Sequence, residues 1–186
     1  MDEATLVGRA VAGDASAWET IVIANQESVF RLAYLILGDP DEAEDAAQET
    51  FLRAWDNLPR FDRSRSLRPW LLRIAANLAS NHRRSAGRHA AALIRSSQSQ
   101  ARAASVEDQT TEHARADELW QAVRRLDAAD QQMIYLRYFL DLSVAETAEA
   151  VQAAEGTVKS RSSRALGRLR TIIEREFPML RDERAT

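Results

Sequence analysis

The 186-residue chain contains no cysteine, which excludes disulfide bonds, thiolate metal sites and a cysteine nucleophile. Glycine and proline are also scarce, at six and four residues, while 45% of the chain is hydrophobic and 28% is charged. This composition is typical of a globular, mostly helical protein. No stretch approaches the roughly 18 consecutive apolar residues of a membrane span, and the N-terminus lacks the apolar core of a signal peptide. We therefore expect a cytoplasmic protein that does not insert into a membrane.

Motifs that would indicate catalysis are missing as well. The chain has no glycine-rich phosphate loop, no paired carboxylates and no nucleophile elbow. Its three histidines, His82, His89 and His113, lie in polar surroundings without metal-ligand spacing. The sequence therefore predicts no metal, no cofactor and no enzymatic activity. The net charge of -3 argues against a surface that binds nucleic acid everywhere, so any DNA contact must come from local patches.

Residues 143–170 have the pattern of two helices around a tight turn. Ser143 and Glu146 form a capping box at the start of the first helix, and Thr157 is expected to start the second. The helical period gives the second helix an apolar face and a polar, arginine-rich face, composed respectively of Val158, Ala165, Leu169 and Ile172, and of Thr157, Arg161, Arg164 and Arg168. A helix-turn-helix needs these two faces to enter a major groove, although a surface helix with a solvated basic face would show the same pattern.

Two helices are expected at the N-terminal end. A short one precedes Gly13, and a long one opens with a second capping box, formed by Ser16 and Glu19. Gly38 lies where a glycine usually ends a helix.

The next helix carries an acidic face. Asp39 and Pro40 are expected to begin it. Acids in the first turn of a helix are favoured by its dipole, but Asp45 and Glu49 lie beyond that turn. We interpret this face as a docking surface for a basic partner.

A polar loop over residues 58–68 leads to a fourth helix, expected from about Leu67 to Arg84. One of its faces is apolar and another carries a row of arginine and asparagine, with Trp70 near the boundary between them. Such side chains can hold a phosphate backbone and stack on unpaired bases. A polar helix face beside a core tryptophan would look the same, and the residues alone leave both interpretations open.

The helical period disappears after Ser85. Residues 85–112 are rich in Ala, Ser, Gln, Arg and Thr, which is typical of a linker, although residues 88–95 could be transiently helical. Further helices follow, and Asp130 is expected to cap one of them. The predicted fold is all-α, with two small helical domains joined by a flexible linker. We expect a first domain at 1–86, the linker at 87–113, a second domain at 114–178 and a tail at 179–186.

Several motifs resemble one known family, the extracytoplasmic-function (ECF, group 4) sigma factors of bacterial RNA polymerase. Region 2 of that family is similar to residues 38–55, GDPDEAEDAAQETFLRAW, and 70–79, WLLRIAANLA. Region 4 is similar to LRY at 136–138, LSVAE at 142–146 and EGTVKSR at 155–161. The motifs stand in the family's order, and the linker has no counterpart of region 3, as in the smallest sigma factors.

The resemblance implies partners for each surface. The acidic helix would dock on the coiled coil of the polymerase's largest subunit through Asp45, Gln48, Glu49, Arg53 and Trp55. The promoter's -10 element would be opened by Phe61, Asp62, Arg63, Ser64, Trp70, Arg73, Asn77, Asn81 and Arg84, and a flipped base would be captured in the pocket of the loop. The -35 element would be read by Gly156, Thr157, Lys159, Ser160, Arg161, Arg164 and Arg168. The polymerase flap and an anti-sigma factor are further implied partners.

Four positions depart from the family's usual residues. Gln152 stands where glycine is common, at a site that favours positive φ. Thr147 replaces a larger apolar residue, and Ser162 and Ser163 replace a Leu-His pair. The Ser162 hydroxyl lies on the inner face, where it must find a backbone carbonyl or cost stability. We therefore expect a looser region 4 and an uncommon -35 preference.

The leading hypothesis is thus a promoter-specificity subunit of RNA polymerase with no catalysis of its own. A free-standing helix-turn-helix regulator that binds duplex DNA without polymerase is the alternative. It would leave the acidic surface and the Trp70 face without a role. A helical enzyme would need a converging set of titratable residues, which the sequence does not provide.

Overall fold

The computed structural model describes the backbone of residues 2–94 and 111–180 and the side chains of residues 2–86 and 115–180. All regular structure in these ranges is helical, which confirms the predicted all-α class. The helices are α1 (Glu3–Val11), α2 (Ala15–Leu37), α3 (Pro40–Asn57), α4 (Leu67–Ile94), α5 (Thr111–Arg124), α6 (Ala128–Ile134), α7 (Val144–Val151) and α8 (Glu155–Glu176). Single turns η1 (Leu58–Arg60), η2 (Tyr135–Phe139) and η3 (Pro178–Leu180) connect or follow them.

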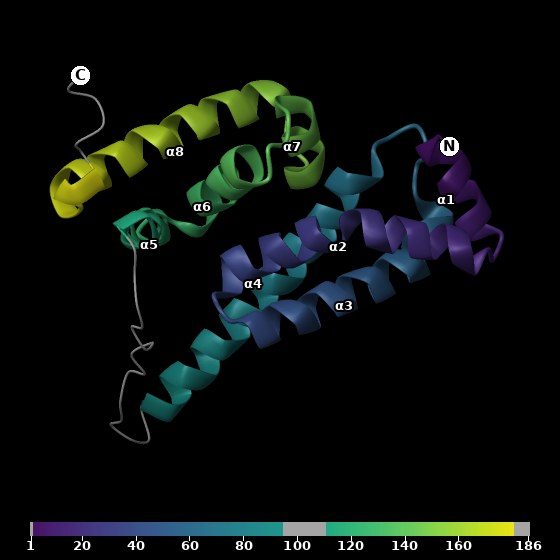
Figure 1. Ribbon diagram of the computed structural model, residues 1–186, viewed down its shortest axis with the longest axis horizontal. Coiled ribbons are helices and arrows are strands. Elements are labelled where there is room, and N and C mark those ends of the chain that lie inside the picture. The colour runs from purple at the N-terminus through teal and green to yellow at the C-terminus, as the bar shows by residue number, and fades with distance from the viewer. Residues whose placement is uncertain (1, 95–110, 181–186) are drawn as a thin grey trace.

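Helices α1 to α4 form the N-terminal bundle, in which α2 packs against α1, α3 and α4 (Figure 1). By length and composition α2 could cross a membrane, since it has 23 residues and an 18-residue stretch of it has a mean hydropathy of 1.2. Its apolar residues are nevertheless those of a core helix, because Val29, Leu32 and Ala33 are fully buried in the bundle. They pack with Leu71 and Leu72 of α4 in the same hydrophobic cluster.

The helix boundaries in this bundle confirm some predicted caps and correct one. Gly38 ends α2 with a φ of 77°, and Asp39 caps α3 by accepting a hydrogen bond from the Glu42 backbone N–H. The predicted capping box of Ser16 at the start of α2 is wrong, because Asp14 is the N-cap. Its carboxylate accepts from the backbone N–H groups of Ser16 and Ala17, and an ionised acceptor satisfies these donors better than a hydroxyl.

Helix α4 is longer than the sequence predicted. It continues beyond Arg84 to Ile94, into the expected linker. The run of alanine at 90–92 explains this extension, because alanine has the highest intrinsic helix propensity. The rest of the expected linker, at 95–110, and residues 181–186 of the expected tail lie outside the described residues, as do the side chains of His89 and His113.

Helices α5 to α8 form the C-terminal domain, where α8 packs against α5, α6 and α7. Two predicted helix starts are wrong here. Asp127, not Asp130, caps α6 by accepting from the Ala129 and Asp130 backbone N–H groups. Helix α8 starts at Glu155, so Thr157 lies inside its first turn. The predicted inner face of α8 is confirmed, since Val158, Ala165 and Leu169 are buried and Ile172 packs against the core.

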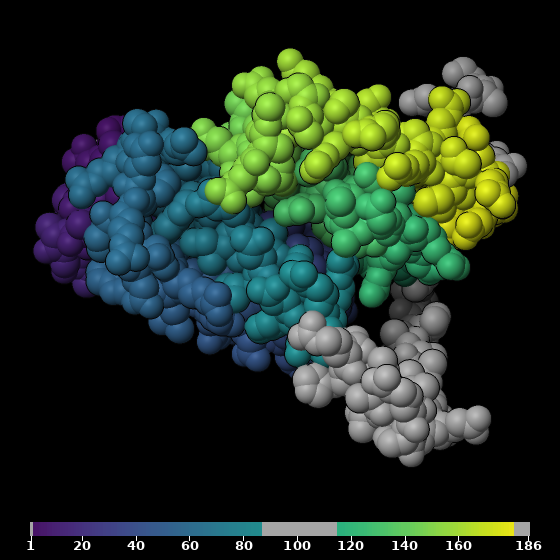
Figure 2. Space-filling view, turned by 180° about the vertical axis from the view of Figure 1, so that it is seen from behind, coloured from purple at the N-terminus to yellow at the C-terminus, as the bar shows by residue number. Residues whose placement is uncertain are grey.

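The two domains pack against each other in this structure. Helix α7 lies against α4, and the C-terminal helices cover one side of the N-terminal bundle (Figure 2). Arg68 of α4 donates a hydrogen bond to the Leu140 carbonyl at 2.9 Å, and Arg83 donates to the Gln131 side chain at 3.0 Å. The interface also has an apolar part, because the rings of Tyr34 on α2 and Trp120 on α5 stack 6.4 Å apart between centroids and one hydrophobic cluster includes residues of both domains.

Candidate nucleic-acid and partner-binding surfaces

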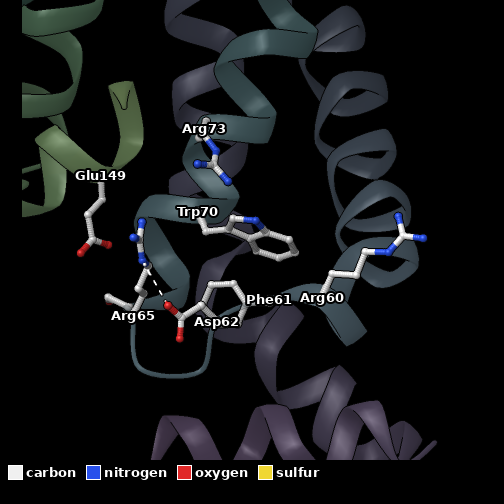
Figure 3. Close-up of a pocket in the computed structure, with 8 residues that line it drawn as sticks. Arg60, Phe61, Asp62, Arg65, Trp70, Arg73 and Glu149 are labelled. Atoms are coloured by element: carbon white, nitrogen blue, oxygen red, sulfur yellow. Dashed lines mark ion pairs between the residues drawn. The ribbon is translucent and has the colours of Figure 1, made fainter. Parts of the chain in front are cut away.

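An aromatic pair forms the floor of a hollow beside the start of α4 (Figure 3). The rings of Phe61 and Trp70 are 4.9 Å apart between centroids and tilted by 47°. The hollow has a volume of about 240 Å³, and its lining includes Arg60, Arg65 and Arg73 together with the acidic Asp62 and Glu149. An aromatic floor on which arginines outnumber acids by three to two is suited to a planar base with a phosphate beside it.

The loop beside this hollow is held by Asp62. Its carboxylate accepts hydrogen bonds from the Ser64 backbone N–H at 3.0 Å and the Ser64 hydroxyl at 2.7 Å. Arg65 closes the turn through its backbone N–H to the Asp62 carbonyl and through an ion pair at 3.4 Å. These hydrogen bonds, led by that of the Ser64 hydroxyl, lower the pKa of Asp62. We infer that Asp62 and Ser64 shape the loop, because their polar atoms are engaged within it.

A second hollow, of about 280 Å³, lies further along α4. Trp70 and Arg73 line both hollows, and Asn77 lines only the second. Arg53 of α3, predicted to contact polymerase, also lines the second hollow. The structure therefore brings one predicted polymerase residue, Arg53, beside three predicted -10 residues, Trp70, Arg73 and Asn77.

The remaining predicted -10 residues lie outside both hollows. Asn81 accepts a hydrogen bond from Arg84 at 2.7 Å, one turn beyond Asn77 on α4. The Arg63 guanidinium lies beside the backbone of α1 at Gly8.

Four residues that line the first hollow are not among the residues predicted by name for the -10 element: Arg60, Arg65, Ser66 and Glu149. The two arginines stand in the predicted loop, so their positive charge beside Phe61 was a usable signal. Glu149 comes from α7 and faces the hollow across the domain interface (Figure 3). No local pattern could have placed it there.

The acidic surface lies on α3. Asp45 and Gln48 are exposed, and Glu49 is half-buried between Arg53 and His82. Arg53 contacts its carboxylate at 2.6 Å, and the His82 imidazole lies 3.4 Å from it. The ion pair with Arg53 neutralises part of the negative charge that was expected to attract a basic partner, which leaves Asp45 as the more available carboxylate.

An apolar residue lies in the middle of the same surface. Leu52 is 67% exposed, and it stands three, four and seven residues after Glu49, Gln48 and Asp45, so all four share one helix face. Trp55 lies at the edge of this face, with its ring 5.1 Å from that of Trp18. The sequence prediction missed Leu52, although an apolar residue on a polar helix face was visible in the pattern.

Helices α7 and α8 have the predicted helix-turn-helix form. The capping box of Ser143 and Glu146 is present in both directions, and the bond from the Ser143 backbone N–H lowers the pKa of Glu146. Gln152 ends α7 with a φ of 52°, as its position in the turn predicted. Thr147 is fully buried, and its hydroxyl donates to the Ser143 carbonyl at 2.8 Å.

The basic face of α8 divides into two parts. Gly156, Lys159, Ser160, Arg161 and Arg164 are exposed, and Thr157 is half-buried beside them. Arg161 makes no ion pair within the described residues, while Arg164 donates back to the Ser160 carbonyl at 3.3 Å. Arg168 differs, because its guanidinium pairs with Asp127 and Asp130 of α6.

The other side of α8 carries a hollow of about 330 Å³. Ser162 and Ser163 line it, together with Tyr138 and Leu166, which are exposed large hydrophobic residues. The Ser162 side chain is buried, and its oxygen has no hydrogen-bond partner within the described residues. The Ser162 hydroxyl was expected either to bond a backbone carbonyl or to cost stability. The described part of the structure shows no such bond, so the second outcome, a desolvation cost, applies.

The chain matches known proteins over both domains. The family model described as sigma-70 region 2 matches residues 21–89, and that described as sigma-70, region 4 matches residues 116–169. The ECF RNA polymerase sigma factor SigW of Bacillus subtilis is 32% identical over 169 residues, which are 85% of this chain and 89% of SigW. This chain belongs to the ECF sigma factors of the sigma-70 family.

Other relatives agree with that assignment. The sigma factor BldN of Streptomyces coelicolor is 34% identical over 171 residues, and this sigma factor spans 64% of BldN's length while matching over 90% of its own. Among solved structures, CnrH in complex with the cytosolic domain of CnrY has a TM-score of 0.72 at 20% identity, covering 95% of this chain and 99% of CnrH. RpoE of Bartonella quintana, in complex with the anti-sigma factor NepR, has a TM-score of 0.66 at 23% identity, covering 85% and 97%. Both structures share the fold of this sigma factor.

Membership decides between the two functional hypotheses. A free-standing regulator needs only the helix-turn-helix, whereas both regions of a sigma factor match here, in the order that the sequence predicted. The chain is a transcription initiation factor, and the interpretation as a free-standing regulator is set aside. Helix α1 lies before the matched residues and has no role assigned by the family models.

Proposed function

We propose that this cytoplasmic sigma factor binds core RNA polymerase through α3, captures an unpaired base of the -10 element in the hollow of Phe61 and Trp70, and reads the -35 element with α8. The aromatic hollow with its three arginines carries the proposal. A helix that binds only duplex DNA has no use for such a hollow, because a paired base keeps its faces stacked inside the helix. The factor itself would catalyse no reaction.

Base capture would offset the cost of opening the promoter. Flipping a base out of a duplex costs a few kcal/mol, and stacking on an aromatic side chain returns about 1–3 kcal/mol per base. Phe61 and Trp70 would supply the stacking, while Arg60, Arg65 and Arg73 would bind the phosphates. Asn77 and Asn81 would contact the same strand further along α4, with Arg84 beside them.

The exposed first turns of α8 would enter the major groove at the -35 element. Arg161 is the best placed to bond a guanine edge, because it is exposed and makes no ion pair within the described residues. Lys159, Ser160 and Arg164 would bind phosphates. Arg161→Ala should therefore weaken -35 binding by about 1–3 kcal/mol and leave polymerase binding unchanged.

The α3 surface would dock on a basic coiled coil of the polymerase's largest subunit. Leu52 would supply apolar contact at the centre, with Asp45 and Gln48 beside it and the Glu49–Arg53 pair at one side. Asp45→Arg should lower core binding, and a variant that keeps wild-type salt tolerance in a pull-down would show that this charge has no docking role. The flap of the polymerase and an anti-sigma factor are further proposed partners, the latter because CnrH and RpoE were solved in such complexes.

Run-off transcription tests the whole proposal. Purified core polymerase is incubated with and without the sigma factor on the DNA upstream of its own gene. A defined start site that requires the sigma factor is expected, and the start locates both promoter elements. Trp70→Ala should reduce transcript from this duplex, whereas the exposed Arg175→Ala on the last turn of α8 serves as the control. Tight binding of the protein alone to the duplex, with no transcript, would contradict the proposal.

A further inference from the structure

The start of α4 is held by a residue of α1. The backbone N–H of Leu67, the first residue of α4, donates to Glu3 Oε1 at 2.9 Å across 64 residues of sequence. The first N–H groups of a helix have no partner inside it, and a carboxylate there is also favoured by the helix dipole. Glu3 therefore fixes where α4 begins, three residues before Trp70.

A second contact joins α1 to the loop that precedes α4. A Cβ placed on Gly8 would lie 3.1 Å from Nη1 of Arg63, so the arginine side chain lies against the bare helix backbone. Arg63 stands inside the turn that Asp62 and Arg65 close. A larger residue at Gly8 would push this side chain away and disturb the turn.

Helix α1 is itself firmly placed. Val7 and Ala10 are fully buried in the core of the N-terminal bundle, and α1 also packs against η1, the turn that leads into the loop. Contacts from α1 thus reach the loop before Phe61, within it at Arg63 and after it at Leu67.

We propose that α1 positions the base-capturing hollow, with Glu3 and Gly8 as its positioning residues. Glu3 sets the start of α4 and thereby the position of Trp70 beside the loop. Gly8 lets Arg63 anchor the loop that carries Phe61. This role rests on the proposed function of the hollow. It makes α1 part of promoter opening, although no residue of α1 lines the hollow.

Two measurements test the proposal on the full chain. Hydrogen exchange of the backbone amides in residues 61–68 reports how stably the loop is held when no DNA is bound. Fluorescence anisotropy reports the affinity of the holoenzyme for a single-stranded oligonucleotide with the non-template -10 sequence mapped by run-off. Binding of core polymerase and of a -35 duplex are measured alongside.

Glu3→Ala should speed exchange in the loop and weaken strand binding about tenfold, the size expected for one charge-assisted hydrogen bond. Glu3→Gln keeps an acceptor at the same reach, so it should weaken binding less. Asp2→Asn removes the same charge one residue earlier, where the side chain caps nothing, and should change neither measurement. Core and -35 binding should stay at wild-type values in all three variants.

Gly8→Leu tests the second contact, because leucine suits a helix but displaces Arg63. It should weaken strand binding in the wild-type background and have no further effect in an Arg63→Ala background. Additive losses in this double-mutant cycle would overturn the role of Gly8.

Wild-type loop exchange and strand affinity in Glu3→Ala would overturn the positioning role. So would a parallel loss of strand, core and -35 binding, since that pattern indicates general destabilisation. A wild-type holoenzyme that does not bind the strand would contradict the proposed base capture instead. In that case faster loop exchange in Glu3→Ala still supports the positioning of the loop by α1, and unchanged exchange overturns it.

Discussion

Arg168 of α8 forms ion pairs with Asp127 and Asp130, 41 and 38 residues earlier in the chain, and the distance to Asp127 is 3.2 Å. Asp130 is only 7% exposed, so this arginine compensates a carboxylate that has little contact with water. A residue expected to contact the -35 element thus also joins the recognition helix to the helix that supports it. Contact between Arg168 and DNA stays a prediction, and the ion pairs give Arg168 a structural role as well.

Arg168→Ala should destabilise the C-terminal domain. An uncompensated carboxylate would remain near the start of α6, at a cost of about 1–3 kcal/mol in the free energy of unfolding. Arg164→Ala is the matched control, because within the described residues the Arg164 side chain forms just a hydrogen bond to its own helix, so its loss should change stability little. Urea unfolding followed by circular dichroism measures both, and equal stability of the two variants would contradict the structural role.

Ser162→Ala should stabilise the domain by about 1 kcal/mol. Its buried hydroxyl has no hydrogen-bond partner within the described residues, so replacing it with a methyl group removes a desolvation cost and leaves no group unpaired. Ser163→Ala, at the adjacent exposed position, should leave the melting temperature unchanged. Destabilisation by Ser162→Ala would show that the hydroxyl is satisfied in solution.

Asp14 should contribute to stability only above strongly acidic pH. Hydrogen bonds from the Ser16 hydroxyl, from Arg9 and from the Ala17 backbone lower the pKa of Asp14 from 3.8 to about 2. A pKa that is lower in the folded state gives stability that is present above the unfolded value and lost as the pH falls through the folded value. The free-energy difference between wild type and Asp14→Asn should therefore be constant near neutral pH and shrink between about pH 4 and pH 2. Urea unfolding at several pH values in this range measures the free-energy difference. A difference that stays at its neutral-pH value at pH 2 would contradict the lowered pKa of Asp14.

Glu149 should weaken binding of the unpaired strand by the free sigma factor. Its carboxylate lines the hollow beside Arg65 and Arg73, where a DNA phosphate is proposed to bind (Figure 3). Glu149→Gln should raise the affinity of the free protein for the -10 oligonucleotide about threefold at low salt, with a smaller gain at high salt because screening weakens the repulsion. Glu19→Gln, an exposed site on α2, is the control for net charge. An equal gain from both variants would show that Glu149 has no local effect.

The sequence determined the features that depend on neighbours within a turn or two. The capping box of Ser143 and Glu146, the cap at Asp39 and the left-handed ends at Gly38 and Gln152 all follow from contacts between residues at most four apart. The inner face of α8 followed from its period in the same way. Because a sigma factor's two regions are long local motifs, the family and the all-α class were also readable from the residues alone.

Only the tertiary structure decided features that depend on packing between distant segments. Predicted N-caps were wrong where two acceptors lie close together in the sequence, as at Asp127 and Asp130. Tertiary packing decides which of them caps the helix and which pairs with Arg168. The bond from Leu67 to Glu3 and the place of Glu149 at the hollow join residues far apart in the chain. Sequence spacing carries no signal for such contacts, since they arise only when buried helix faces fix the helices against one another.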